Sequence, residues 1–219
     1  MIILCLIFFF KKKKFEQIKP ILLTNLRKFK ENDTFGVLVR LTAQMRSIED
    51  KFIKYALPYE IIGGPRFFER KEIKDVLCYL KLANSFQDDL AFERIINLPR
   101  RGIGEQSLKI IIDNARKNKT SFFESLKELL KENKLASSLT LKTQPFVDLI
   151  IKINGLINKT SLDDLGIYVI EESGYLKMLE NEKNKLKKIE NESRIDNLKE
   201  LANALAEFEN LDNFLEHVG

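Results

Sequence analysis

Apolar residues recur at every third or fourth position from Glu69 almost to the end of this 219-residue chain. That period places apolar side chains along one face of an α-helix. Stripes of this kind lie at residues 73–80, 92–96, 108–115, 122–130, 146–157, 162–170, 195–208 and 211–218. Each stripe is too narrow for a helix that is buried all round, so the sequence predicts a helical bundle in which every helix packs one face. Residues 177–199 alternate in charge, which predicts either a solvated face or a mobile loop.

The segment from residue 15 to residue 66 has a different pattern. The spacing predicts a helix over 15–30, and the continuous apolar run at 35–39 is typical of a buried strand in a parallel sheet. Ser47 is a suitable N-cap for a helix that runs to Tyr55, and residues 59–62 form a second short strand. Together these elements make one βαβ crossover. Because two parallel strands cannot bury their own faces, we expect them to belong to a larger sheet.

The first fourteen residues, MIILCLIFFFKKKK, join an apolar run to four lysines. The apolar run is about half of the ~20 residues that a membrane-spanning helix needs. A signal peptide carries its basic residues before the apolar stretch, whereas here the order is reversed. We therefore interpret residues 1–14 as a low-complexity N-terminal extension, with a weak membrane contact as the alternative.

Charge and composition exclude several classes of protein. The net charge is +5, and the segment 94–119 alone carries seven basic and two acidic residues, which favours an anionic partner. Two cysteines and one histidine, His217, are too few for a structural zinc site, a disulfide framework or a well-placed Cys–His or Ser–His pair. We therefore expect no metal site, no catalytic residues in this chain and a reducing, cytoplasmic location.

The sharpest local feature is INLPRRGIGEQSLKII, at residues 96–111. A short helix ends at Leu98-Pro99, and two glycines then bracket Ile103 before a second helix begins near Glu105. Glycines let the backbone approach a phosphate closely, and the unpaired amides at the start of a helix attract anions. With Arg100 and Arg101 beside it, this pattern is that of a helix–hairpin–helix clamp for the DNA backbone. The alternative is a tight interhelical turn with two solvated arginines.

Two other patterns give a negative result. None of the nine glycines is followed by Lys and then Ser or Thr, so the chain has no phosphate loop for nucleotide hydrolysis. The acidic pairs Asp88-Asp89 and Asp163-Asp164 could bind a divalent ion, but adjacent carboxylates diverge. We interpret them as N-caps of the helices that follow.

The chain closely resembles one stretch of the UvrD/PcrA/Rep-type superfamily 1 DNA helicases. The resemblance is carried by VLVRLTAQMRSIEDKFIKYALPYEIIGGPRFFERKEIKDVLCYLKLANSFQDDLAFERIINLPRRGIG, and more loosely by residues 171–180 and 194–218. It implies a mainly α fold, in which a helical insertion domain called 2B is attached to a partial βαβ piece of the RecA-like motor domain 2A. The expected domains are the extension at 1–14, a partial 2A segment at 15–66 and a helical, DNA-binding 2B-like subdomain at 67–219.

The resemblance also implies three groups of residues. The duplex-DNA contact would consist of Arg100, Arg101, Gly102, Ile103, Gly104 and Lys109. A single-strand contact would map onto Arg40, Thr42, Gln44 and Arg46. There Thr42 replaces the family's usual Asn and removes a two-donor amide, which weakens that assignment. A domain-junction role is assigned to Arg66, Arg70, Glu72, Lys74 and Asp75, whose alternative is a set of surface charge pairs.

The function implied is that of a fragment of an ATP-dependent 3′–5′ DNA helicase of DNA repair, which contributes duplex contact. The family's ATPase motifs lie outside the matched stretch, so we expect ATP and Mg²⁺ to serve only the complete helicase and this chain to be inactive alone. The expected partners are duplex DNA and the duplex/single-strand junction, with the missing motor parts or repair proteins as further candidates and no membrane. The alternatives are a helical protein-interaction module and a non-functional remnant of a split helicase gene.

Overall fold

The computed structural model describes residues 2–5, 48, 59–62 and 67–218. The chain divides into two compact units, Met1–Arg70 and Lys71–Gly219, and each is described here by itself. No helix among the described residues is both long and apolar enough to cross a membrane.

The described part of the first unit contains two strands that pair in parallel. β1 (Ile2–Cys5) lies beside β2 (Tyr59–Ile62), with Ile2 opposite Tyr59 and Cys5 opposite Ile62. The strand predicted at 59–62 is confirmed. β1 lies within residues 1–14, whose interpretation as a low-complexity extension stays a prediction, and its apolar run is typical of a strand in a parallel sheet. A short 3₁₀ helix, η2 (Phe67–Glu69), ends the unit.

The other elements predicted for this unit, at 15–30, 35–39 and 47–55, lie outside the described residues. The exception is Ile48, which is helical and buried. The RecA-like character of the segment therefore stays a prediction.

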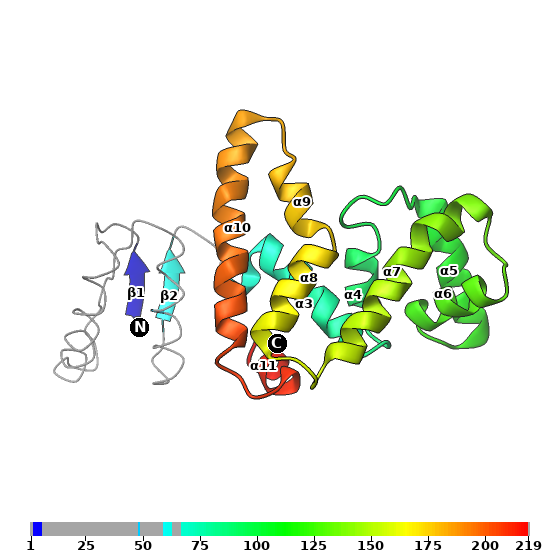
Figure 1. Cartoon of the computed structure of the whole chain (residues 1–219), viewed down its shortest axis with the longest axis horizontal. Coiled ribbons are helices and arrows are strands. Elements are labelled where there is room, and N and C mark those ends of the chain that lie inside the picture. The colour runs from blue at the N-terminus through cyan, green and yellow to red at the C-terminus, as the bar shows by residue number, and fades with distance from the viewer. Residues whose placement is uncertain (1, 6–47, 49–58, 63–66, 219) are drawn as a thin grey trace. The chain divides into compact units, whose positions relative to one another are not determined.

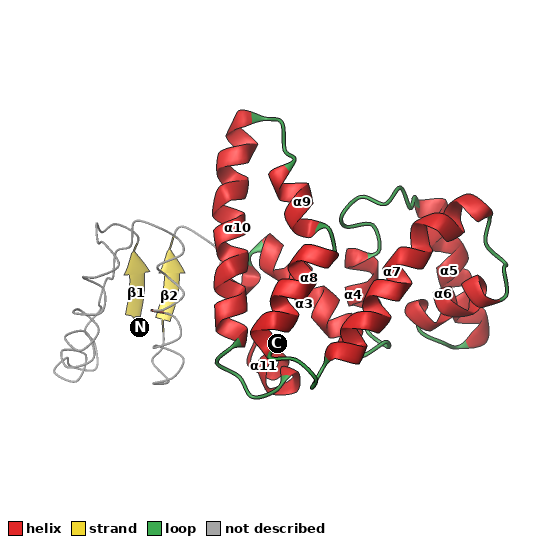
Figure 2. Ribbon diagram, in the orientation of Figure 1, coloured by secondary structure: helices red, strands yellow, loops and turns green. Residues whose placement is uncertain are grey.

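The second unit is helical throughout, as the apolar stripes predict (Figures 1 and 2). Its described helices are α3 (Lys71–Asn84), α4 (Asp89–Ile95), α5 (Glu105–Asn118), α6 (Phe122–Lys131), α7 (Ser137–Leu156), α8 (Leu162–Glu172), α9 (Tyr175–Glu180), α10 (Lys185–Leu205) and α11 (Leu211–Val218). The mainly α fold class is thus confirmed for this part of the chain.

Helix α3 is the centre of this unit. It contacts α4, α7, α8 and α10, and its stripe residues Ile73, Val76 and Leu80 have no exposed surface. In Figure 1, α5 and α6 lie at one end with α7, while α8 to α11 lie at the other. Edge-to-face rings join α4, α6 and α7, because Phe146 lies 5.9 Å from Phe92 and 6.5 Å from Phe123 between centroids.

Two helices are longer than the stripes indicated. α7 begins at Ser137, nine residues before the stripe at 146–157, and it contains the buried Thr143 and an internal Pro145 that interrupt the apolar pattern. α10 begins at Lys185, so much of the segment 177–199 is a helix and not a mobile loop. Most of its described side chains between residues 187 and 196 are exposed, which agrees with the solvated face that was the other expectation. The first half of α10 contains a buried Asn191 where a stripe would need an apolar residue.

The acidic pairs lie at helix starts. Asp88 is the N-cap of α4, and its carboxylate accepts a hydrogen bond from the amide of Ala91 at 2.9 Å. Asp89 accepts one from the amide of Phe122 at 2.8 Å, which ties α4 to the start of α6. The N-cap of α8 is Ser161, so the prediction that Asp163 and Asp164 cap this helix is wrong. They lie two and three positions further on, in the first turn, where a negative charge is favourable to the helix dipole.

Candidate nucleic-acid interface

The loop between α4 and α5 is held by a side chain of its own. Asn97 follows the last turn of α4, and its Oδ1 accepts hydrogen bonds from the amides of Arg101 at 2.8 Å and Ile103 at 3.2 Å. Hydrogen bonds from the backbone to a nearby Asn side chain take the place of the regular backbone hydrogen bonds that a helix or strand has and a loop lacks. The loop therefore has a defined shape without any ligand.

Arg101 points into the protein from this loop. Its Nη1 donates to the carbonyls of Ile95 at 2.9 Å, Ile96 at 3.2 Å and Pro99 at 3.3 Å, which lie at and just after the end of α4. Its Nη2 donates to the Tyr79 hydroxyl at 2.7 Å, and that hydroxyl donates to the carbonyl of Leu98. The guanidinium also lies 5.1 Å from the ring centroid of Phe146. Arg101 thus connects α3, α4 and α7 to the loop through its hydrogen bonds and its contact with Phe146.

The Gly-Ile-Gly sequence adopts the geometry that its residues suggest. Gly102 has φ +72°, in the left-handed region, and its carbonyl accepts a hydrogen bond from Lys142 Nζ at 3.2 Å. Ile103 is 4% exposed and anchors the turn. Gly104 is the N-cap of α5 with no side-chain cap, and no atom lies within 4 Å of the place that a Cβ would take. The start of α5 therefore has no side-chain cap, and there is free space beside Gly104.

Exposed basic side chains surround this helix start. Arg100 and Lys109 are exposed, and Lys142 reaches Gly102 from α7. The acidic Glu105 also lies in the first turn of α5.

The seven basic residues of 94–119 do not form one patch. Arg94 binds Asp75, Arg101 is used internally, and Arg116, Lys117 and Lys119 lie at the far end of α5, about 20 Å from Gly104 for a helix of this length. Of the seven, only Arg100 and Lys109 can add positive charge close to the loop. A third positive charge there comes from Lys142, which lies outside the segment 94–119.

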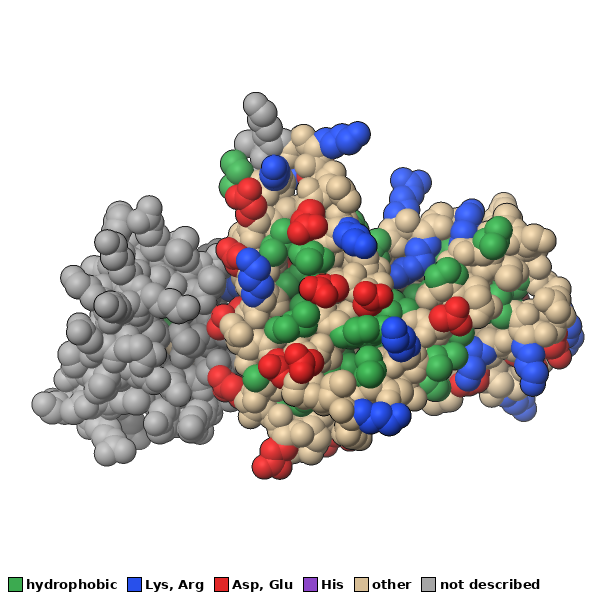
Figure 3. All heavy atoms as spheres, viewed as in Figure 1, with side chains coloured by type: hydrophobic (Ala, Val, Ile, Leu, Met, Phe, Trp, Pro, Cys, Tyr) green, Lys and Arg blue, Asp and Glu red, His purple; other side chains and the backbone are tan. Residues whose placement is uncertain are grey.

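Charge is also distributed unevenly over the helical unit. Residues 94–142 carry eleven basic and five acidic side chains, whereas residues 162–218 carry seven basic and fourteen acidic ones. On the face shown in Figure 3, most acidic side chains lie over α8 to α10, and mainly basic ones lie over α4 to α7. An anionic polymer is therefore attracted to one half and repelled by the other.

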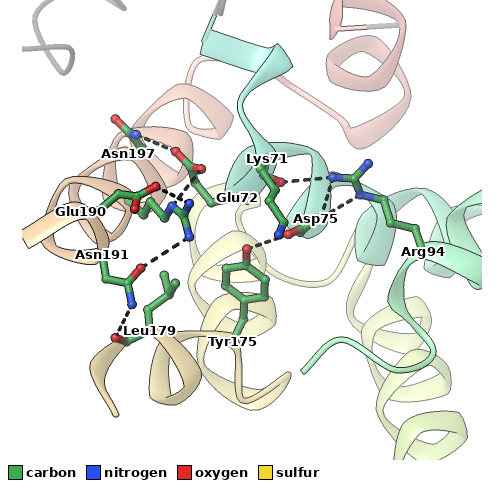
Figure 4. A network of polar contacts seen from close by, with 10 residues as sticks. Lys71, Glu72, Asp75, Arg94, Tyr175, Leu179, Glu190, Asn191 and Asn197 are labelled. Carbon is green, nitrogen blue, oxygen red and sulfur yellow. Dashed lines mark hydrogen bonds and ion pairs between the residues drawn. The ribbon is translucent and has the colours of Figure 1, made fainter. Parts of the chain in front are cut away.

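Glu72 and Asp75, assigned to the domain junction, lie in a buried network (Figure 4). Asp75 accepts hydrogen bonds from Arg94 Nε and from the Tyr175 hydroxyl, both at 2.7 Å. Burial and the neighbouring Asp75 raise the pKa of Tyr175 above its ordinary value. Glu72 accepts one from Asn197 Nδ2 at 2.7 Å. The alternative of surface charge pairs is therefore wrong for these two residues, and the contacts join α3 to α4, α9 and α10.

Two more junction residues differ from these. Lys74 is exposed, and Arg70 is 5% exposed with its guanidinium 5.3 Å from the ring centroid of Phe67. Arg66 and the single-strand candidates Arg40, Thr42, Gln44 and Arg46 lie outside the described residues. The junction and single-strand assignments stay predictions.

Other reactive groups in the described part of the chain do not gather into a site. No group of His, Cys, Asp or Glu side chains there could hold a metal ion. Burial raises the pKa of the half-buried Cys78 thiol, and His217 lies against the ring of Phe208 with centroids 5.1 Å apart. No segment in the described part of the chain has the Gly-Lys-Ser/Thr sequence of a nucleotide-phosphate loop.

Sequence reasoning missed three residues that shape the loop, namely Tyr79, Asn97 and Lys142. An Asn directly after a helix is a signal for a side-chain-closed turn, so Asn97 was accessible to sequence reasoning. Tyr79 and Lys142 approach from distant helices, and no local pattern marks them.

Comparison with known proteins agrees with this description. The family model of the UvrD-like helicase C-terminal domain matches residues 6–218. A probable DNA helicase II homologue of Rickettsia conorii is 42% identical over 187 residues, covering 83% of this chain and 27% of the relative. DNA helicase II of Haemophilus influenzae is 39% identical, with coverages of 83% and 24%. The ATP-dependent DNA helicase PcrA of Bacillus subtilis is 35% identical, with coverages of 80% and 23%.

This chain thus spans about a quarter of the length of these relatives. The family match covers nearly all of the chain, and the relatives share well over 30% identity with it. The chain belongs to the UvrD-like helicase C-terminal domain family, among the relatives of DNA helicase II and PcrA.

Proposed function

We propose that the helical unit is the duplex-DNA contact of a UvrD/PcrA-type helicase of DNA repair, and that the α4–α5 loop binds the phosphate backbone. The observation that carries this proposal is the pre-shaped loop whose exposed end is the uncapped start of α5. Arg100 and Lys142 flank that start. Backbone amides and long cations recognise phosphates without reading bases.

The uneven charge of the helical unit favours duplex DNA over a small anion as its ligand. A single phosphate would need only the loop, whereas a duplex also reaches the other basic side chains of α4 to α7. The repulsive α8–α11 half limits how the unit can lie on the duplex. The α4–α7 half then faces the DNA.

Unwinding with 3′–5′ polarity, together with ATP and Mg²⁺, is proposed only for the complete helicase. We assign no step of ATP hydrolysis to this chain, because its sequence has no Gly-Lys-Ser/Thr phosphate loop. Purified protein should show no ATPase activity with single-stranded DNA present. Clear turnover that follows the protein through purification would contradict this assignment.

The decisive experiment measures binding of the full chain to a labelled duplex with a 3′ single-stranded tail over a salt series. Arg100→Ala and Lys109→Ala should each reduce the slope of log K against log salt by about one unit if each side chain meets one phosphate. Lys177→Ala, which removes an equally exposed charge from α9, is the matched control and should leave the slope unchanged. Absence of wild-type binding at low salt would contradict the proposal.

A second candidate function is the docking of a basic partner protein. It is favoured by the acidic α8–α11 half, which exposes Ile167 and Ile189. Binding of a basic protein that Ile167→Ser abolishes, with no measurable DNA affinity, would support this function instead. The alternative of a non-functional remnant predicts an aggregating protein without a cooperative unfolding transition.

A further inference from the structure

We infer that the two neighbouring arginines have different roles: Arg100 contacts the DNA, whereas Arg101, together with Tyr79, is a positioning residue that holds the loop in its binding shape. This inference rests on the proposed function and divides a pair that the sequence presents as one basic feature. Arg101 stays within the protein when the DNA is bound.

The hydrogen bonds of Arg101 support this division. Its two terminal nitrogens serve three backbone carbonyls and the Tyr79 hydroxyl at 2.7–3.3 Å, while its flat face lies over Phe146. A guanidinium can satisfy such a set because its donors are fixed in one plane. Turning it towards a phosphate would break these bonds and remove a donor from the carbonyls of Ile95, Ile96 and Pro99.

Tyr79 allows the positioning role of Arg101 to be tested without a change of charge, because it is an uncharged partner of that arginine. Its side chain has no exposed surface, so it cannot touch DNA in this fold. Its hydroxyl nevertheless joins Arg101 to the carbonyl of Leu98 in the loop. Removing that hydroxyl changes neither charge nor exposed surface, and any effect on DNA affinity must pass through the loop.

A lysine should replace Arg100 but not Arg101. Arg100 is exposed and acts as a cation near a phosphate, a role that an ammonium group fills. An ammonium in place of Arg101 cannot span three carbonyls and a hydroxyl or stack on Phe146. The two conservative variants therefore separate contact from positioning.

The test uses the same tailed duplex and the full chain with five variants, Arg100→Ala, Arg100→Lys, Arg101→Ala, Arg101→Lys and Tyr79→Phe. Arg100→Ala should lower affinity about fivefold and flatten the salt slope by about one unit, and Arg100→Lys should restore both. Both Arg101 variants should lower affinity about tenfold, and Tyr79→Phe should lower it several-fold with the slope unchanged. Tyr168→Phe on α8 is the matched control and should bind as the wild type does.

Amide hydrogen exchange separates a displaced loop from general unfolding. Arg101→Lys and Tyr79→Phe should lose protection at the amides of Arg101 and Ile103, which Asn97 holds, and keep it in α3 and α8. Full rescue by Arg101→Lys, or wild-type affinity of Tyr79→Phe, would overturn the inference. A wild-type chain that binds no DNA would instead refute the proposed function itself.

Discussion

The residues that matter most in the helical unit are polar side chains that accept or donate several hydrogen bonds at once. Asp75 is 1% exposed and binds Arg94 from α4 and Tyr175 from α9. Buried charges of this kind stabilise a fold mainly because losing one partner leaves the other desolvated and unpaired. Small substitutions at these sites should therefore have large effects.

Removing the Asp75 carboxylate should destabilise the unit severely. Asp75→Ala leaves the Tyr175 hydroxyl, on a side chain that is 2% exposed, without its acceptor. We expect a loss of about 2–4 kcal/mol in the free energy of unfolding. Urea denaturation followed by circular dichroism measures it, with Asp113→Ala on the exposed face of α5 as the control; equal stability of the two variants would contradict this account.

Tyr175 also makes stability depend on alkaline pH. Its pKa is raised in the folded state, so above the ordinary tyrosine value of 10.0 the folded chain holds a proton that the unfolded chain releases. The free energy of unfolding should consequently fall as the pH rises from about 9 to 11. Wild type should lose more of it than Tyr175→Phe over the same interval, and identical pH profiles would show that Tyr175 makes no such contribution.

The two glycines of the loop should separate stability from binding. Gly104→Ala meets no atom within 4 Å and should change the free energy of unfolding by less than about 1 kcal/mol. Its methyl group would nevertheless occupy free space beside the start of α5, where we propose that a phosphate binds, and should weaken DNA binding. Gly102→Ala should instead lower the free energy of unfolding by about 1–2 kcal/mol, because φ +72° disfavours a Cβ. Thermal melting and DNA titration of both variants check this, and unchanged DNA affinity of Gly104→Ala would count against the amide contact.

At the scale of elements, the sequence was most informative where one apolar stripe coincides with one helix. α8 and α11 followed from such stripes because their buried positions hold no polar side chain. α3 and α6 followed as well, because apolar residues fill most of their buried positions beside Glu72, Asp75 and Ser125. Early α7 and α10 did not, since Thr143 and Asn191 occupy buried positions and interrupt the pattern. The loop sequence likewise indicated a phosphate clamp, but the inward turn of Arg101 depends on Tyr79 and Phe146, which lie far away in the chain.

Helix α8 packs on α10 closely enough to require a glycine. A Cβ at Gly166 would lie 2.5 Å from Cδ1 of Leu205, a side chain that is 1% exposed and has little room to move. Gly166→Ala should therefore destabilise the unit by about 1–3 kcal/mol, although alanine favours helices. Gly155→Ala near the end of α7, where no atom lies within 4 Å, is the control and should be neutral or slightly stabilising in thermal melts. Equal melting temperatures for both would contradict the close packing.

At the scale of the whole unit, α3 connects the two regions discussed above. Asp75 and Tyr79 lie one turn apart on it, so one helix face holds both the α4–α9 network and the α4–α5 loop. Displacing α3 would disturb both together.

The uneven charge of the unit should appear in its binding to DNA. Neutralising acidic side chains of the α8–α11 half, as in Glu171→Gln/Glu192→Gln, should raise DNA affinity at low salt, because repulsion from that half decreases. The rise should shrink towards zero in about 0.5 M salt, where screening is nearly complete over these distances. Fluorescence anisotropy titrations at both salt concentrations measure it, and an unchanged low-salt affinity would mean that this half lies beyond the reach of the DNA.

In the proposed complex, the α4–α5 loop offers main-chain amides and flexible cations to the phosphates of the DNA backbone. Such contacts look the same at every base pair, so the energy of the complex repeats smoothly along the duplex. A protein held in this way meets no sequence-dependent barrier when it moves from one step to the next. The proposed contact would therefore let the helical unit stay bound while its position along the duplex changes.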